Sequence, residues 1–182
     1  MLWNRLKYVL SPQFDIYRKI SEVVRGRVAD IGFGVGFGTH LFLVNGREIC
    51  GYDISEQAIS FAQEVFPFSK LVFRYGNIEK DIDDTPYDFI TMIDVIEHLK
   101  DQKHALHNVK KLMAVNGTFI CSTPNRLSRY RKSANHVKEF APKEFEALLK
   151  SVFVSVSLRD YKLTPIVSQY ENPLVAFCRN EA

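Results

Sequence analysis

Residues 28–38 read VADIGFGVGFG, a short apolar run that leads into a glycine-rich turn. The run over 27–31 has the length and apolar character of a buried strand, and the segment after the turn has those of a helix. Glycine lets a backbone turn tightly and approach a ligand without interference from a Cβ atom. The alternating glycines therefore predict a cofactor-binding loop. The alternative is a turn needed only to pack the helix on the strand.

Three residues around these glycines favour one class of cofactor. The dinucleotide-binding pattern needs a glycine at position 37, where this chain has Phe37. Asp30 precedes the first glycine, and a carboxylate there is poorly placed for a pyrophosphate but can pair with an amino group. Asp53 ends the next predicted strand, where a carboxylate can accept hydrogen bonds from both hydroxyls of a ribose. These residues favour a nucleoside with an ammonium-bearing tail over NAD.

Strands and helices alternate along the rest of the chain. Predicted helices cover 12–25, 37–44, 55–65, 101–114 and 142–150. Predicted strands cover 27–31, 48–52, 71–75, 87–93, 118–122, 152–158 and 174–178. This alternation predicts an α/β fold with a doubly wound, mostly parallel sheet that helices cover on both faces. Right-handed crossovers place the loops that follow the strands along one edge, where such sheets bind ligands.

The composition is that of one domain over residues 1–182. The chain is 46% hydrophobic and 25% charged, and it has no apolar run of the roughly 18 residues that cross a bilayer. Charged residues interrupt the first ten positions, so no secretion signal is expected and the predicted location is cytoplasmic. The net charge of +3 does not by itself imply nucleic acid. Without metal-site spacing, Cys50, Cys121 and Cys178 are expected as buried free thiols.

Several motifs resemble those of class I S-adenosylmethionine-dependent methyltransferases, and the resemblance covers almost the whole chain. The motifs are residues 30–38, 52–55, 87–90 and 116–119. The resemblance implies a Rossmann-like methyltransferase fold, a seven-stranded, mostly parallel sheet with an antiparallel last strand, and it implies S-adenosyl-L-methionine as the cofactor. The cofactor-binding residues that it implies are Asp30, Gly32, Gly34, Gly36, Asp53, Ile54, Asn77, Ile78 and Ile93.

The same resemblance assigns parts of the cofactor to these residues. Asp30 and the glycines line the methionine portion, Asp53 holds the ribose hydroxyls, and Ile54 lies against the adenine. Residues 76–78 flank the adenine ring. The family usually has an aspartate where this chain has Asn77, whose amide can still bond to the adenine amino group.

A second element, DVIEHL at 94–99, carries chemistry of its own. If 94–98 is helical, Asp94, Glu97 and His98 share one face, and His136 comes from the loop after the fifth strand. Two carboxylates and two imidazoles suit a divalent metal such as Mg²⁺. With residues 122–125 and 136–140, this element resembles the ubiquinone-biosynthesis O-methyltransferase subgroup. Metal binding is associated with the constellation there and in small-RNA 3′-end methyltransferases.

Other interpretations of these four residues stay open. Asp94 can cap the following helix, and His98 can be a structural histidine bonded to backbone. Either His98 or His136 can instead be a catalytic general base, since an imidazole with a pKa near 6.5 takes a phenolic proton at neutral pH.

Two segments are candidates for contact with an acceptor. The acceptor-side loop over 124–141 is basic, with Arg126, Arg129, Arg131, Lys132 and Lys138, and it can receive an anionic acceptor or be simply solvated. The segment 1–25 is interpreted as a helical lid over the cofactor, although it can also lie on a membrane surface or pack on the core.

The predicted function is O-methylation of a small-molecule acceptor such as a phenol, a sugar or a lipid precursor. The alternatives are an RNA methyltransferase that uses the basic loop, a non-catalytic cofactor-binding module in a complex, and an NAD-dependent oxidoreductase. Phe37 and Asp30 disfavour the oxidoreductase, and nucleic acid is a possible partner that the composition does not favour.

Overall fold

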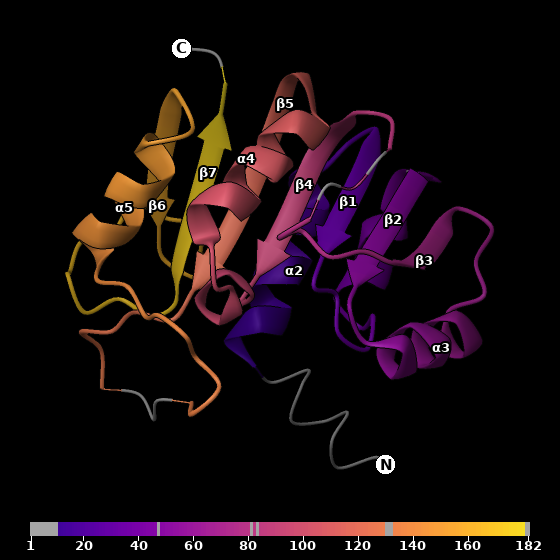
Figure 1. The fold of residues 1–182 in the computed structure, drawn as a ribbon, viewed down its shortest axis with the longest axis horizontal. Helices are drawn as coiled ribbons and strands as arrows, with labels where there is room; N and C mark the ends of the chain where they lie inside the picture. Colours follow the sequence, from indigo (N-terminus) through magenta and orange to yellow (C-terminus); the bar gives the residue numbers. More distant parts are fainter. Residues whose placement is uncertain (1–10, 47, 81, 83, 130–132, 181–182) are drawn as a thin grey trace.

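The computed structural model describes residues 11–46, 48–80, 82, 84–129 and 133–180, and its centre is a seven-stranded sheet with the strand order β3-β2-β1-β4-β5-β7-β6 (Figure 1). The strands are β1 (Arg27–Ile31), β2 (Glu48–Asp53), β3 (Leu71–Tyr75), β4 (Tyr87–Ile93), β5 (Met113–Thr123), β6 (Ser155–Arg159) and β7 (Leu174–Arg179). Neighbours among β1–β5 pair in parallel, and β7 pairs antiparallel with both β5 and β6. The predicted doubly wound sheet with an antiparallel last strand is confirmed.

Helices cover both faces of this sheet. The helices are α2 (Pro12–Val23), η1 (Thr39–Gly46), α3 (Glu56–Val65), η2 (Ile96–His98), α4 (Gln102–Leu112) and α5 (Pro142–Lys150). One core joins α4 and α5 to the face of the sheet that carries Ala29 and Met92. The other joins α2, η1 and α3 to the opposite face, with Val28 and Phe73. Burial on both faces explains the near-continuous apolar run of β4.

The segments predicted as helices over 37–44 and 101–114 differ in form or extent. The first is the 3-10 helix η1, because the turn continues through Gly38 and the helix begins only at Thr39. The second ends at Leu112, and residues 116–117 do not close it as predicted. Met113 already pairs with Tyr87 in the sheet, and residues 114–117 form a bulge before β5 and β4 pair again.

The strand predicted over 152–158 begins later, at Ser155. The backbone N–H groups of Val152 and Phe153 donate to the Leu149 carbonyl, at 3.0 and 2.9 Å, and so belong to the end of α5. The three cysteines are buried free thiols, as predicted. Within the part of the chain that the structure describes, no helix is long and apolar enough to cross a membrane.

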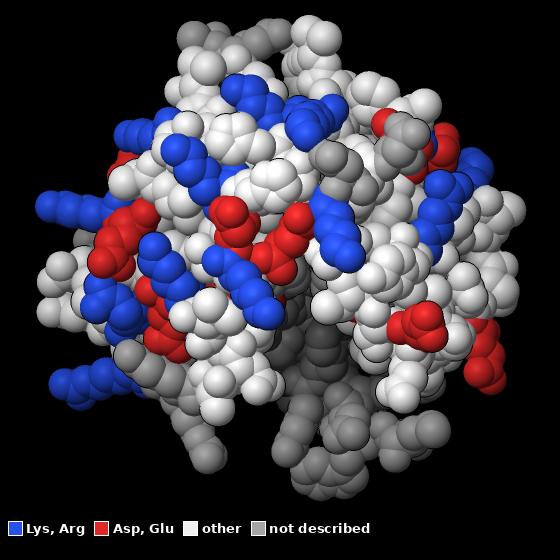
Figure 2. Space-filling view, in the orientation of Figure 1, with Lys and Arg blue, Asp and Glu red and all other residues white. Residues whose placement is uncertain are grey.

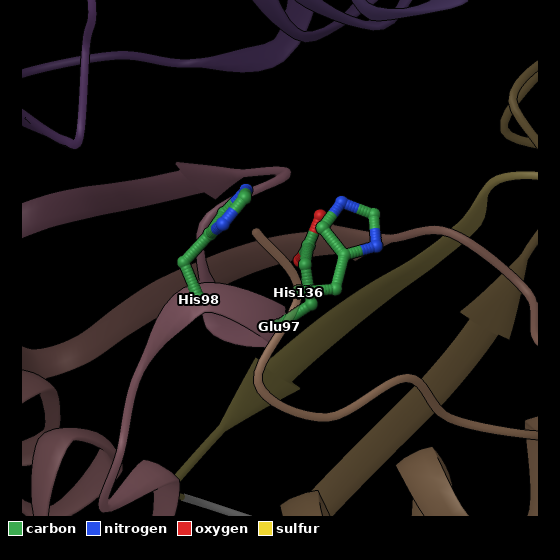
Figure 3. A group of neighbouring side chains, drawn as sticks. All are labelled: Glu97, His98 and His136. Atoms are coloured by element: carbon green, nitrogen blue, oxygen red, sulfur yellow. The ribbon is translucent and has the colours of Figure 1, made fainter. Parts of the chain in front are cut away.

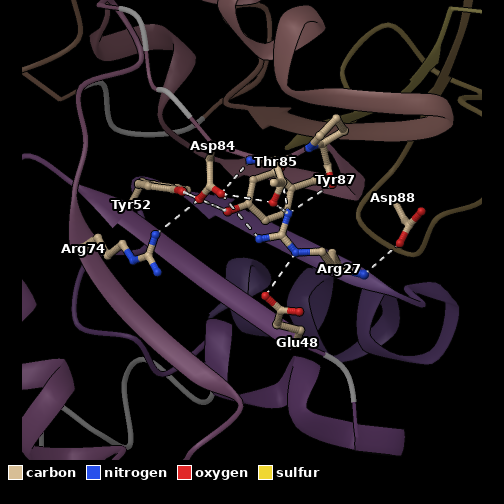
Figure 4. A network of polar contacts seen from close by, with 9 residues as sticks. Arg27, Glu48, Tyr52, Arg74, Asp84, Thr85, Tyr87 and Asp88 are labelled. Carbon is tan, nitrogen blue, oxygen red and sulfur yellow. Dashed lines mark hydrogen bonds and ion pairs between the residues drawn. The ribbon is translucent and has the colours of Figure 1, made fainter.

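A polar network ties the segment between β3 and β4 to the sheet (Figure 4). The Asp84 carboxylate accepts hydrogen bonds from the hydroxyls of Tyr52 and Tyr87 and lies 3.5 Å from Arg27 and 3.4 Å from Arg74. Burial pushes the pKa of Asp84 up, but the two phenol hydrogen bonds and Arg27 outweigh it and lower the pKa. The network therefore fixes an ionised carboxylate that anchors the chain just after residues 76–78.

Candidate functional site

The glycine-rich turn after β1 lies at the carboxyl-end edge of the parallel strands. Gly32, Gly34 and Gly36 have φ values of 72°, 60° and 80°, which is left-handed backbone that favours glycine. A Cβ atom built on Gly32 would lie 2.4 Å from Val95, so that glycine is needed for packing. A Cβ atom on Gly34 would meet nothing within 4 Å. Gly34 is therefore the glycine that borders open space, where a ligand can approach the backbone.

Asp53 connects the end of β2 to this turn. Its Oδ2 accepts from the Gly34 N–H and its Oδ1 from the Ser55 N–H, both at 2.9 Å. Each carboxylate oxygen accepts more than one hydrogen bond, so both retain capacity for a ligand hydroxyl. The next side chain, Ile54, is 64% exposed and has no core role to explain it. Asp53 and Ile54 thus flank the same open space as Gly34.

The other implied cofactor residues lie at strand ends along the same edge. Asn77 is partly buried, and its Oδ1 accepts from the Glu79 N–H at 2.9 Å. The side chains of Ile78 and Ile93 are 3% and 6% exposed and belong to the two cores. The predicted role of Ile78 and Ile93 in binding a cofactor would therefore depend mainly on their backbone atoms.

Asp30 lies beneath the turn, completely buried. Its Oδ1 accepts from the hydroxyls of Tyr17 at 3.1 Å and Thr91 at 2.7 Å, and its Oδ2 accepts from the Thr39 hydroxyl at 2.6 Å. Burial raises the pKa of Asp30 to about 6, although the three hydroxyl bonds oppose the shift. In this structure the Asp30 carboxylate is bonded to protein hydroxyls. Its predicted effect on the methionine portion would therefore act through the turn that lies above it.

The stretch 94–98 is not an α-helix. Asp94 has a φ of 54°, and only Ile96–His98 forms a single 3-10 turn, η2. The helix on which a shared face of Asp94, Glu97 and His98 depends is therefore absent, because the left-handed Asp94 breaks the helical repeat. Both Asp94 oxygens are engaged, Oδ1 by the Ser122 hydroxyl at 2.6 Å and Oδ2 by the Gln13 amide at 2.7 Å.

Three of the four predicted metal ligands nevertheless come together (Figure 3). One ligand atom from each of Glu97, His98 and His136 lies within 4.8 Å of the other two, whereas Asp94 is outside the group. Glu97 is fully buried; its Oε2 accepts from the Thr123 hydroxyl at 3.0 Å, and its Oε1 has no hydrogen-bond partner among the described residues. Burial, and then the nearby Asp94 carboxylate, raise the pKa of Glu97 to about 8.

Each imidazole of this cluster is oriented by its other ring nitrogen. The Nδ1 of His98 lies 3.0 Å from the Asn135 carbonyl oxygen, and the Nδ1 of His136 lies 2.9 Å from Glu139 Oε1. An Nδ1–H that donates in this way leaves Nε2 with a lone pair, which is the arrangement typical of metal-binding histidines. The orphaned Glu97 oxygen and two such imidazoles fit a divalent cation.

Backbone contacts hold the loop that carries His136 against η2. The Glu97 carbonyl accepts from the N–H groups of Val137 at 2.8 Å and Lys138 at 3.1 Å. On the same loop, Arg126 pairs with Glu144 at 2.9 Å, so its charge is already partnered. Arg131 and Lys132 of the predicted basic loop, and residues 1–10 of the predicted lid, lie outside the described residues.

Figure 2 shows the face that α4 and α5 cover, where Lys and Arg side chains are interspersed with Asp and Glu. The described residues on this face form no continuous basic surface of the kind that binds a nucleic-acid backbone.

Some residues of the site escape prediction from the sequence. They are Gln13, Tyr17, Thr39, Thr91, Ser122, Thr123 and Glu139. One signal was available for Thr91, because it is a polar residue inside the apolar run of β4 and needs a buried partner. Glu139 is only three positions from His136, so this spacing was a signal as well. The others bond to residues in other elements of the fold.

Comparison with known proteins gives the class of protein. The description "Methyltransferase domain" applies to the family that matches residues 4–161. The chain therefore belongs to the methyltransferase domain family, and the resemblance found in its motifs is confirmed. Its fold also matches a TehB-like SAM-dependent methyltransferase from Corynebacterium glutamicum with a TM-score of 0.76 at 18% identity, over 98% of this chain and 94% of that one.

Two curated relatives are similar in sequence. A probable S-adenosylmethionine-dependent methyltransferase of Mycolicibacterium smegmatis is 30% identical over 115 residues, 62% of this chain and 44% of that protein. A ubiquinone biosynthesis O-methyltransferase of Alkalilimnicola ehrlichii is 30% identical over 108 residues, 55% of this chain and 42% of that protein. The chain spans about half the length of the curated relatives it matches. The family and these relatives support S-adenosyl-L-methionine as the cofactor.

Proposed function

We propose that this protein is an S-adenosylmethionine-dependent O-methyltransferase for a small-molecule acceptor, assisted by a divalent cation at Glu97, His98 and His136. The observation that carries the proposal is the cluster of these three side chains. Glu97 and His98 follow β4 and His136 follows β5, so the cluster lies at the same carboxyl-end edge of the sheet as Gly34 and Asp53. An oxygen acceptor, whose proton must leave, is the nucleophile that such a cluster serves best.

The cofactor-binding site that we propose is formed by residues of the glycine-rich turn and of the neighbouring strand ends. Gly34 leaves space for the methionine portion, Asp53 accepts from the ribose hydroxyls, and Ile54 covers the adenine with its exposed side chain. Asn77 and the backbone of residues 76–78 form the other wall. S-adenosylmethionine supplies an electrophilic methyl group, and the acceptor oxygen must approach it in line, so positioning provides much of the rate.

In this proposal Glu97, His98 and His136 hold the cation, with Glu139 and the Asn135 carbonyl orienting the two imidazoles. Mg²⁺ or a similar divalent ion supplies Lewis-acid chemistry that makes an acceptor hydroxyl more acidic. The alternative is that His98 or His136 takes the acceptor proton directly as a general base. The two alternatives differ in whether a chelator abolishes activity.

The acceptor class that we propose is a phenol, a sugar or a lipid precursor, which includes anionic compounds. The Alkalilimnicola ehrlichii relative, named as an O-methyltransferase of ubiquinone biosynthesis, supports oxygen as the accepting atom. The pairing of Arg126 with Glu144 leaves fewer free cations for RNA. We also propose that the segment over 1–25 is a lid and that 124–141 is the acceptor-side loop of a single domain.

A methyl-transfer screen tests this proposal. Release of S-adenosylhomocysteine is measured with phenols, sugars and RNA, with and without EDTA. We expect turnover of a small hydroxylated acceptor that EDTA abolishes and Mg²⁺ or Mn²⁺ restores. His136→Ala should lose turnover, while His107→Ala, at an exposed histidine on α4, should retain it. Turnover that resists EDTA but requires His136 would favour the general base, and turnover of RNA alone would overturn the acceptor class.

A further inference from the structure

Helix α2 donates hydrogen bonds to two carboxylates at the carboxyl-end edge of the sheet, the buried Asp30 and the partly buried Asp94. Gln13 and Tyr17 are one helical turn apart, so they lie on the same face of α2. The Gln13 amide donates to Asp94 Oδ2 at 2.7 Å, and the Tyr17 hydroxyl donates to Asp30 Oδ1 at 3.1 Å. A single face of α2 thus contacts the carboxylate beneath the glycine loop and the carboxylate that follows β4.

The Tyr17 ring also rests directly on the glycine loop. A Cβ atom on Gly38 would lie 2.5 Å from the Tyr17 ring, so this position must be glycine for the helix to dock. The ring is buried and lies 5.5 Å from the Phe42 ring of η1, measured between centroids. The conformation of the loop therefore depends on Tyr17 at its carboxyl end and on the bonded Asp30 at its base.

Gln13 has a different effect on Asp94. The Ser122 hydroxyl engages Oδ1 and the Asp94 N–H donates to Ser122 Oγ at 3.0 Å, so Gln13 is the partner that turns Oδ2 toward α2. With both oxygens engaged, Asp94 stays out of the group formed by Glu97, His98 and His136. Asp94 is therefore held from two sides, by α2 through Gln13 and by the sheet through Ser122.

We propose that Gln13 and Tyr17 are positioning residues that dock α2 onto Asp94 and Asp30, so that docking of this helix and binding of the cofactor are thermodynamically coupled. The inference deepens the proposed function, because it assigns α2 to the same site. Coupling is reciprocal: if docked α2 raises the affinity for the cofactor by some factor, bound cofactor favours docking of α2 by that same factor. The opposite face of α2, with Arg18 and Glu22 in exposed ion pairs, makes no such contact and offers a control.

The test uses S-adenosylhomocysteine as the probe and needs no acceptor. Its dissociation constant is measured by calorimetry, and trypsin cleavage after Arg18 and Lys19 reports opening of α2. We expect the probe to slow cleavage of the wild-type protein. Gln13→Leu and Tyr17→Phe should each weaken probe binding by about 5- to 10-fold and lose protection in proportion, while Glu22→Ala should match wild type.

Circular dichroism below the melting transition confirms that each variant is folded. A purely structural role would lower the melting temperature and leave the dissociation constant unchanged, and that result would overturn the inference. Wild-type cleavage that the probe does not slow would overturn it as well. If the wild-type protein bound no probe, the cofactor assignment itself would fail. Because neither readout uses methyl transfer or a metal, failure of the acceptor or cation proposal leaves this test intact.

Discussion

Replacing Asp30 with asparagine should remove one pH-dependent contribution to stability. The Asp30 carboxylate is completely buried, and its pKa in the folded protein is about 6 against an ordinary value of 3.8. Between these values the folded protein holds a proton that the unfolded chain has lost. The free energy of unfolding therefore falls as the pH rises through this window, and is level above it.

The pKa of Asp30 is about 2 higher in the folded protein than in the unfolded chain. At about 1.4 kcal/mol per pH unit, this difference corresponds to a loss of about 3 kcal/mol between pH 4 and pH 6.5. Urea denaturation at a series of pH values measures it as the difference between wild type and Asp30→Asn. The other carboxyl groups contribute equally to the free energy of unfolding of both proteins, so their contributions cancel in this difference. We expect this difference in the free energy of unfolding to change by about 3 kcal/mol between pH 4 and pH 6.5. The wild-type protein loses stability relative to the variant as the pH rises.

Asp160→Asn is the matched control. Burial acts to raise the pKa of Asp160, but hydrogen bonds from the Thr164 N–H and hydroxyl outweigh it and lower the pKa. Its difference curve should therefore be level above about pH 4. A level difference for Asp30→Asn over the same range would refute the reasoning, because it would mean that the three hydroxyls keep Asp30 ionised without cost.

Three further substitutions test the site and its supports. Asp53→Ala should weaken S-adenosylhomocysteine binding by about 10- to 100-fold in calorimetry, since hydrogen bonds to a carboxylate are lost, and unchanged binding would remove Asp53 from the cofactor-binding site. Gly38→Ala should lower the free energy of unfolding by about 1–3 kcal/mol because its Cβ atom would lie 2.5 Å from the Tyr17 ring, and equal stability would show that the ring can yield. Asp84→Ala should lower it by about 2–3 kcal/mol, since the buried hydroxyls of Tyr52 and Tyr87 lose their shared charged acceptor and retain each other as partners, and an unchanged melting temperature would show that water replaces the carboxylate.

The fold could be predicted from the sequence because its signals are local. Each central strand is an apolar run, and the glycines after β1 mark the turn by their backbone freedom alone. The boundaries that were wrong depend on tertiary pairing. Met113 joins the sheet because Tyr87 lies opposite, which no helical pattern over 101–114 reveals.

The candidate site also has a part that the sequence predicts and a part that depends on tertiary contacts. Residue types and the proximity of η2 to the loop after β5 were enough to bring Glu97, His98 and His136 into one prediction. Asp94 does not share a helical face with Glu97 and His98, because its backbone is left-handed and it bonds instead to Ser122 and Gln13, which are 28 and 81 positions away. The hydroxyls around Asp30 come from three separate segments, so spacing in the sequence carries no record of them.

Calorimetric titration with Mn²⁺ tests most directly whether Glu97, His98 and His136 form a cation site beside the cofactor. Glu97→Gln preserves the size of the side chain and an acceptor for the Thr123 hydroxyl, but it cannot ionise to the carboxylate that a cation binds. His107→Ala controls for a histidine elsewhere. We predict that wild type and His107→Ala bind one Mn²⁺ per chain, and that Glu97→Gln binds it at least about 100-fold more weakly. Wild-type protein that binds no Mn²⁺, or a Glu97→Gln variant that binds it equally well, would contradict the cation site.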